Sequence, residues 1–111
     1  MSVEGLWTTE IFGLWGWEHR GVLVLRNGRA LGGGNNHHST GRYTEDGGDV
    51  SISLQIIYHG TPRTMFGATE REFTLEVSGV RKGNQITGEM YRADRRELKL
   101  PFRLTHRADM S

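Results

Sequence analysis

The chain has 111 residues, of which 14 are Lys or Arg, 13 are Asp or Glu, 16 are Gly and none is Cys. A chain of this length is predicted to form one domain, residues 1–111, and its balanced charge argues against direct binding of nucleic acid through a basic face. Without Cys there are no disulfides or thiolate metal sites, which favours a reducing, cytoplasmic location. The longest apolar run, residues 22–25, is too short to span a membrane.

Turn-forming residues recur about every eight to twelve positions along the chain, and the runs between them have the composition of strands. Asn27-Gly28 predicts a type I′ hairpin, because both residues tolerate positive φ. Residues 13–18 and 60–70 are expected to be loops. Strands are expected over residues 5–12, 19–26, 29–35, 39–45, 49–58, 71–80, 85–92 and 97–106.

The fifth expected strand shows the alternation of side chains most clearly. Val50, Ile52 and Leu54 alternate with serines, which makes one face apolar and the other polar. Ile57 breaks this pattern, because it lies on the polar face. The residues expected to line a buried interior are Trp7, Val50, Ile52, Leu54, Phe73, Leu75, Ile86, Met90, Leu100 and Phe102.

Short connections between neighbouring strands favour simple up-and-down order. Eight alternating strands with hairpin-length connections bury their common apolar face in a closed barrel. We therefore predict an all-β fold, an eight-stranded up-and-down antiparallel β-barrel. The interior of such a barrel is just filled by side chains or holds one small ligand. Pro101 lies on the outward face of the eighth strand and predicts a free edge or a bulge there.

The three tryptophans have different surroundings in the sequence. Trp7 follows Gly5-Leu6 and resembles the Gly-x-Trp of lipocalin-like barrels, in which the Trp closes one end; composition alone indicates a core aromatic residue. Trp15 and Trp17 lie two apart between glycines. Together with Ile57 they are candidates for an interface, and the alternative is that they fold back over the barrel end. An interface between two copies predicts a homodimer.

Neither metal binding nor catalysis is predicted. His37 and His38 are adjacent, which on a strand places them on opposite faces and prevents both from binding one ion. The sequence has no Cys nucleophile and no Gly-x-Ser-x-Gly segment. An enzyme site built from Arg42, Glu45 and His59 is an alternative, although nothing in the sequence brings these residues together. We therefore expect a protein without enzymatic activity and without a cofactor.

Glu45, Asp46 and Asp49 form an acidic cluster in the predicted hairpin between the fourth and fifth strands. In an exposed turn these carboxylates are hydrated and keep the protein soluble. The alternative is a recognition patch for a basic partner, since clustered exposed charge steers association.

Several segments of the first half occur in an order that resembles the GrlR-like proteins, which are small negative regulators of type III secretion and their uncharacterised relatives. The resemblance spans residues 5 to about 58 and continues beyond them only as a strand pattern. It implies an eight-stranded lipocalin-like barrel, usually dimeric, with an apolar interior, in a cytoplasmic protein without enzymatic activity. The segments are residues 5–7 (GLW), 21–28 (GVLVLRNG), 31–34 (LGGG) and 40–46 (TGRYTED).

In the founding member of that family, an acidic surface loop is implicated in recognising a transcriptional activator. The matching stretch here is residues 45–49 (EDGGD), in which glycines interrupt the acidic run. The resemblance therefore implies a regulator that contacts a transcriptional regulator through Glu45, Asp46 and Asp49. The alternative is a carrier or sensor of a small apolar, lipid-like ligand inside the barrel. Residues 40–43 (TGRY) also resemble a segment of biotin-binding barrels, which leaves biotin as a further option.

Overall fold

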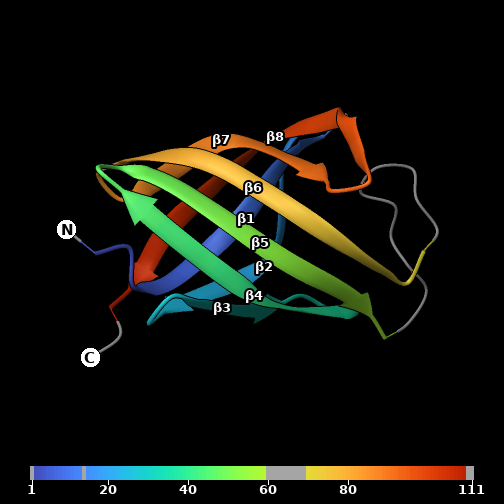
Figure 1. The fold of residues 1–111 in the computed structure, drawn as a ribbon, viewed down its shortest axis with the longest axis horizontal. Helices are drawn as coiled ribbons and strands as arrows, with labels where there is room; N and C mark the ends of the chain where they lie inside the picture. The colour runs from blue at the N-terminus through green and yellow to red at the C-terminus, as the bar shows by residue number, and fades with distance from the viewer. Residues whose placement is uncertain (1, 14, 60–69, 110–111) are drawn as a thin grey trace.

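The computed structural model describes residues 2–13, 15–59 and 70–109. Each strand in this part of the chain pairs antiparallel with the next, and β8 returns to pair with β1, so the sheet closes into a barrel (Figure 1). This confirms the predicted all-β, eight-stranded, up-and-down barrel. The described residues include no helix that is long and apolar enough to cross a membrane. The strands are β1 Gly5–Gly13, β2 Gly16–Arg26, β3 Arg29–Gly33, β4 His37–Asp46, β5 Asp49–Tyr58, β6 Glu72–Lys82, β7 Gln85–Arg92 and β8 Arg95–Ala108.

Two-residue turns set the register of two strand pairs. Asn27 and Gly28 have φ angles of 50° and 78°, in agreement with the type I′ turn expected between β2 and β3. Gly47 and Gly48, with φ angles of 60° and 99°, connect β4 to β5 in the same way. Glycine and a few polar residues adopt such angles at little cost, which is why these turns can be recognised in the sequence.

The predicted loop over residues 13–18 is wrong, because β2 already begins at Gly16. The β1–β2 ladder continues through the pair formed by Phe12 and Trp17. The two rings pack edge to face with their centroids 5.4 Å apart, and such cross-strand aromatic pairs stabilise a sheet. The glycines in this stretch predict a loop, whereas the contact between Phe12 and Trp17 keeps the chain in the sheet.

Other strand ends differ from the prediction by one or two residues. β3 ends at Gly33, two residues earlier than predicted, and β4 begins at His37, which is also two residues earlier than predicted. β6 and β8 extend to Lys82 and Ala108, two residues farther than predicted. These ends carry polar residues that pair through the backbone, so hydrophobic alternation does not report them. The loop predicted over residues 60–70 lies, apart from residue 70, outside the described residues.

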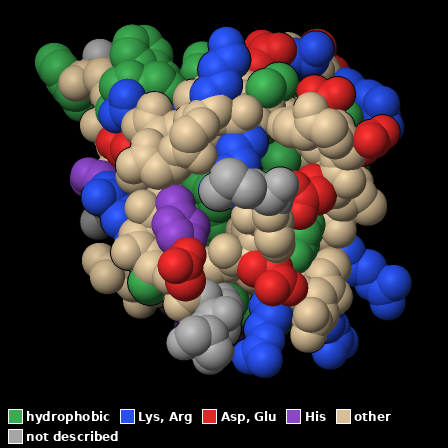
Figure 2. All heavy atoms as spheres, turned by 90° about the vertical axis from the view of Figure 1, so that its left-hand side faces the viewer, with side chains coloured by type: hydrophobic (Ala, Val, Ile, Leu, Met, Phe, Trp, Pro, Cys, Tyr) green, Lys and Arg blue, Asp and Glu red, His purple; other side chains and the backbone are tan. Residues whose placement is uncertain are grey.

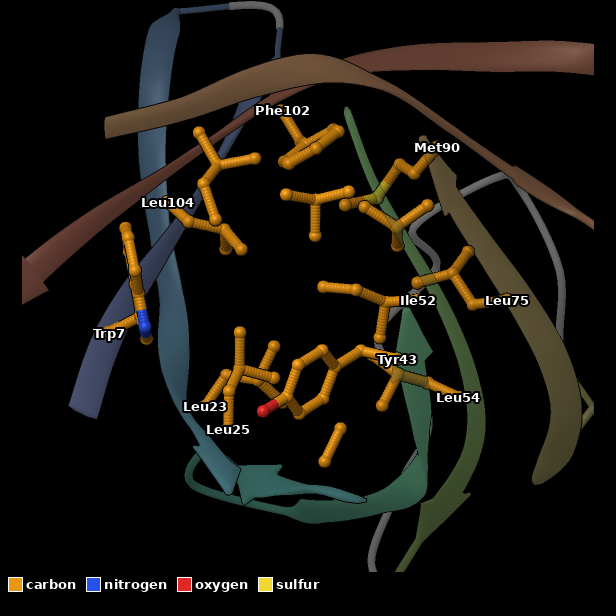
Figure 3. Packing of buried hydrophobic residues seen from close by; sticks show 14 of the residues in the cluster. Trp7, Leu23, Leu25, Tyr43, Ile52, Leu54, Leu75, Met90, Phe102 and Leu104 are labelled. Carbon is orange, nitrogen blue, oxygen red and sulfur yellow. The ribbon is translucent and has the colours of Figure 1, made fainter. Parts of the chain in front are cut away.

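The inward side chains of the strands meet in one core. Figure 3 shows them extending from the wall toward the centre of the barrel. Leu100 is partly buried against this core, and Ile57 is half-buried on the outer face. The predicted interior residues that are buried are Trp7, Val50, Ile52, Leu54, Phe73, Leu75, Ile86, Met90 and Phe102.

Pro101 lies where β8 has lost one of its two neighbours. It pairs with Glu89 of β7, whereas the β1–β8 ladder ends at the pair formed by Ile11 and Phe102. Beyond that pair the side of β8 that faces β1 is a free edge, where a missing N–H costs no ladder hydrogen bond. The edge predicted at Pro101 is therefore confirmed for this part of β8.

A pair of inward-facing glycines makes room for an aromatic ring in the core. Gly79 of β6 pairs with Gly88 of β7, and Gly88 in turn pairs with Phe102 of β8. A Cβ atom at Gly79 would lie 2.8 Å from the Phe102 ring. One at Gly88 would lie 2.0 Å from the carbonyl oxygen of Ser78. The two glycines thus allow the neighbouring strands and the Phe102 ring to approach closely.

We expect Gly88→Ala to destabilise the fold by about 1–3 kcal/mol, because the added methyl group meets backbone atoms that can move only by distorting the ladder. Urea denaturation followed by tryptophan fluorescence measures the effect. Thr87→Ala, at the exposed neighbouring position, is the control and should cost less than about 1 kcal/mol. Equal stability of wild type and Gly88→Ala would contradict the close approach described here.

Candidate functional site

One end of the barrel carries both termini and is closed by the N-terminal segment (Figure 1). Val3 is fully buried, and its carbonyl accepts a 2.9 Å hydrogen bond from Nε1 of Trp7. The Val3 amide donates to Oε1 of Glu45 at 3.1 Å. The Arg81 guanidinium lies 5.6 Å from the centre of the Trp7 ring. Figure 2 shows acidic and basic side chains mixed around this end. Trp7 thus lies under the segment that covers this end of the core.

The opposite end holds an open pocket of about 190 Å³, which we call the mouth. A second cavity, of about 50 Å³, lies inside the barrel among mainly apolar side chains. Arg20 and His37 line both spaces, so the mouth and the interior cavity are neighbours that share these two side chains. The residues that line the mouth come from β2, the β3–β4 connection, β4 and β5, and they are His19, Arg20, Gly21, Gly34, Asn35, Asn36, His37 and Tyr58.

The interior cavity is small because core side chains fill most of the barrel. A volume of about 50 Å³ is room for one or two water molecules, each of which occupies about 30 Å³ in the liquid. Pockets that enclose larger ligands measure about 300–1,000 Å³. A lipid-like ligand inside the barrel stays a prediction, and it would require several core side chains to move.

A β-bulge turns Arg20 toward the mouth. Thr9 of β1 pairs with Gly21 of β2, and Glu10 pairs with His19, which leaves Arg20 as the extra residue of β2. Unbroken alternation from the buried Leu23 and Leu25 would place residue 20 on the outer face. Bulges commonly re-aim a side chain beside a functional site, and this one brings a cation to the mouth.

The bulge depends on glycine at position 21. Gly21 has a φ of 146°, which side chains rarely adopt. A Cβ atom there would also lie 2.1 Å from the carbonyl oxygen of Gly33 on the adjacent strand. Both observations require glycine, so residue 21 determines where the bulge lies and which way the Arg20 side chain points.

Arg20 is only partly paired. Its Nη2 donates to Oε2 of Glu18 across 3.4 Å. Its Nε is buried and has no hydrogen-bond partner among the described residues. A buried donor without an acceptor costs about 1–3 kcal/mol.

His37 and Tyr58 face each other across the mouth, with ring centroids 5.5 Å apart. Burial lowers the pKa of His37, and the positive charges of His59, Arg20 and His38 lower it further. Burial also raises the pKa of the Tyr58 phenol, while Arg20 opposes that shift. At neutral pH both rings are therefore uncharged, and among the described residues that line the mouth the Arg20 guanidinium supplies the fixed positive charge.

The predicted acidic residues lie at the tip of the β4–β5 hairpin, at the closed end of the barrel. Glu45, Asp46 and Asp49 are exposed, and Asp46 lies directly across the ladder from Asp49. Among the described residues, none of the three forms an ion pair. Glu45 has a structural contact, since it accepts the hydrogen bond from the amide of Val3. The structure therefore brings the three carboxylates together but gives one of them a second role.

An open groove of about 640 Å³ adjoins this hairpin on the outer face of β5 to β8. Asp49 and Glu89 contribute negative charge to it, and Lys99 contributes positive charge. Val80, which is 43% exposed, and Tyr91 supply apolar surface. The acidic hairpin thus continues into a surface with both polar and apolar contacts, as is typical of protein interfaces.

Trp15 and Trp17 do not project together. Trp15 is 90% exposed at the β1–β2 turn, whereas Trp17 is 38% exposed and lies within β2. The Arg103 guanidinium covers the Trp17 ring at 4.2 Å and donates two 3.0 Å hydrogen bonds to the carboxylate of Glu10. These hydrogen bonds are the main reason that the pKa of Glu10 is lowered. Of the two tryptophans, Trp15 is the freer to contact another molecule.

The histidines near the mouth lie on both faces of the sheet. His37 lines the mouth, whereas His38 Nδ1 lies 2.5 Å from Nε2 of His59 on the exposed side. Among the described residues there is no group of three or more His, Asp or Glu that could hold a metal ion. The trio Arg42, Glu45 and His59 is not brought together, because Glu45 lies near the end of β4 beside the start of β5, whereas His59 follows the last residue of β5.

A search of known protein families finds no match to this sequence, and a search of characterised proteins finds none either. The closed antiparallel barrel of eight strands is consistent with the lipocalin-like families. The fold alone does not define an activity, because one barrel supports many functions.

The mouth residues were not predicted as a site. Nothing in the sequence indicates that Tyr58, at the end of β5, lies beside Arg20 and His37. The available signal was Gly21, since a glycine inside a strand of aliphatic residues often marks a bulge. A bulge at Gly21 predicts that the side chain of Arg20 points inward.

The lowered pKa of His37 predicts a loss of stability in mild acid. The unfolded chain takes up a proton on this residue near the ordinary histidine pKa of about 6.5, whereas the folded chain does so only at lower pH. The contribution of His37 to folding stability is therefore fully present above that pH and falls as the pH drops below it. Urea denaturation gives the free energy of unfolding and should be repeated at about three pH values per unit between pH 8 and pH 5. The free energy of unfolding should depend less on pH for His37→Gln than for wild type. Identical pH dependence of the two proteins would contradict the burial of this ring.

Proposed function

We propose that this protein is a non-enzymatic β-barrel regulator that acts by protein–protein contact through its acidic hairpin. The observation that carries the proposal is the placement of Asp46 directly opposite Asp49, both exposed and unpaired with a cation among the described residues. Like charges directly opposite each other destabilise a sheet. A basic surface on a partner would remove that repulsion on binding and would be steered toward the hairpin beforehand.

The resemblance of residues 5–58 to the GrlR-like proteins supports this function and suggests the kind of partner. In the founding member an acidic surface loop is implicated in recognising a transcriptional activator, and residues 45–49 occupy the matching stretch. The proposed partner is therefore a transcriptional regulator with a basic contact surface, in the cytoplasm. The groove that begins at Asp49 extends the contact beyond the three carboxylates to Tyr91 and Lys99.

The test must remove charge without disturbing the N-terminal segment. Glu45→Gln keeps a side-chain oxygen that can accept the hydrogen bond from Val3, whereas Glu45→Ala would remove it. We therefore expect the triple variant Glu45→Gln, Asp46→Asn and Asp49→Asn to fold like wild type. The variant should lose a DNA-binding regulator that wild type captures from an extract of its own cells, as identified by mass spectrometry.

The matched control replaces acidic residues elsewhere on the barrel. Glu72 and Glu97 are exposed and do not line the groove, so Glu72→Gln with Glu97→Gln should retain the partner. Purified partner and wild type should then bind more weakly as salt is added, because exposed charges are screened. Capture of the same proteins by wild type and by the triple variant would contradict the proposed role of the hairpin.

The proposal includes a homodimer formed around the β1–β2 turn. Trp15 is 90% exposed there, and Phe12, at the end of β1 beside the turn, is 47% exposed. Large apolar side chains with this exposure are typical of interfaces, and a buried tryptophan often dominates the binding energy.

We expect Trp15→Ser to weaken self-association by about tenfold or more, as measured by sedimentation equilibrium. Leu98→Ser changes a large apolar residue that is 38% exposed on β8 and should leave self-association unchanged. A monomeric wild type at all concentrations, or an unchanged equilibrium for Trp15→Ser, would contradict this interface.

A second candidate function is the binding of a small ligand. It is supported by the mouth and the neighbouring interior cavity, which share Arg20 and His37 in their linings. This function does not require the acidic hairpin, which lies at the other end of the barrel.

A further inference from the structure

The guanidinium of Arg20 lies at the mouth and is only partly paired, and the described lining of the mouth contains no carboxylate. Glu18 accepts a hydrogen bond from Nη2 of Arg20, while the buried Nε has no acceptor among the described residues. A guanidinium fits the planar, two-oxygen geometry of a carboxylate better than any other side chain does.

The charges around the mouth favour an anion over a cation. Burial is the main reason that the pKa of His37 is lowered, and repulsion from His59, Arg20 and His38 lowers it further, so the field of these groups opposes positive charge at that ring. The same field favours a negative charge placed beside the ring. Asn35 and Asn36 add amide groups to the rim, and the hydroxyl of Tyr58 completes the polar lining.

The interior cavity offers an apolar end to any ligand held at the mouth. Beyond Arg20 and His37 its lining includes Leu54, Met90 and Leu104. The mouth has a volume of about 190 Å³, and the cavity adds about 50 Å³. An engineered cavity of about 150 Å³ holds benzene, so the mouth alone suits a molecule of about six carbon atoms.

From this geometry we infer that the mouth binds a small amphipathic carboxylate, with its carboxylate on Arg20 and only the end of its apolar tail in the interior cavity. The inference refines the second candidate function, because it replaces a purely apolar ligand with one that has an anionic head. It is independent of the acidic hairpin and of the proposed protein partner.

Hexanoate is a suitable probe, and three related molecules separate the contributions of head and tail. Hexanol has the same tail without charge, hexylamine has the opposite charge, and acetate has the same head without the tail. Isothermal titration calorimetry on the full chain should give hexanoate an affinity at least about tenfold above that of each of the other three.

The position of the ligand can be tested without any substitution. In wild type, nuclear Overhauser effects should connect the methyl group of hexanoate to the methyl group of Met90, because that side chain lines the interior cavity. The ring resonances of His37 should shift on titration, since a bound carboxylate favours protonation of the ring. Contacts confined to the outer surface of the barrel would overturn the inference.

Substitution of Arg20 tests the anionic head directly. We expect Arg20→Gln to weaken hexanoate binding by about tenfold or more while leaving the weak binding of hexanol unchanged. Arg42→Gln removes the same charge at an exposed position outside the mouth and should bind hexanoate like wild type. If Arg20→Gln does not fold, Arg20→Lys keeps the charge but lacks the planar fork, and it should bind several-fold more weakly.

The outcomes separate this inference from the proposed regulatory function. The Asp46→Asn, Asp49→Asn protein should bind hexanoate like wild type, because the hairpin lies at the opposite end of the barrel. No detectable binding of hexanoate, equal affinity for hexylamine, or full affinity in Arg20→Gln would each overturn the inference without affecting the acidic hairpin.

Discussion

Closure of the sheet by the β1–β8 ladder is the constraint on which the rest of this structure depends. Pairs from Leu6 with Ala108 to Ile11 with Phe102 join the first strand to the last, and the ring then has one enclosed face. Eight strands give an interior that side chains just fill. The core therefore leaves only a cavity of about 50 Å³ inside the barrel, and the larger space for another molecule lies at its open end.

The two ends are used differently. At one end Val3 and Trp7 cover the core, and Glu45 holds the covering segment through the Val3 amide. The carboxylate that belongs to the candidate recognition patch thus also supports the fold, so loss of its charge and loss of its oxygen have separate consequences. At the other end a bulge places Arg20 over the remaining cavity. A protein contact at the first end and a ligand at the second would share the same strands, which offers a physical route by which one could influence the other.

The elements that could be predicted from sequence are those whose signals are local. Asn27-Gly28 requires positive φ at both positions, and Val50, Ile52 and Leu54 alternate in a way that only a half-buried strand explains. The predicted interior was right for the same reason. The error at residues 13–18 arose because Trp17 is held in the sheet by Phe12 on the other strand, a contact that no local pattern reports. The mouth was missed because a bulge reverses the inward and outward positions that alternation assigns, and because Arg20, His37 and Tyr58 come from three separate strands.

The sequence by itself determined the strand number, the up-and-down order and about half of the residues of the core, because each of these follows from periodicity two and from turns that need glycine or asparagine. It also placed three carboxylates in one hairpin. The tertiary structure decided which end of the barrel is covered, how much space is left inside, and which cation faces that space. Those properties depend on register across strands that are distant in the chain, and a shift of one residue at Gly21 is enough to move Arg20 from the outer face to the mouth.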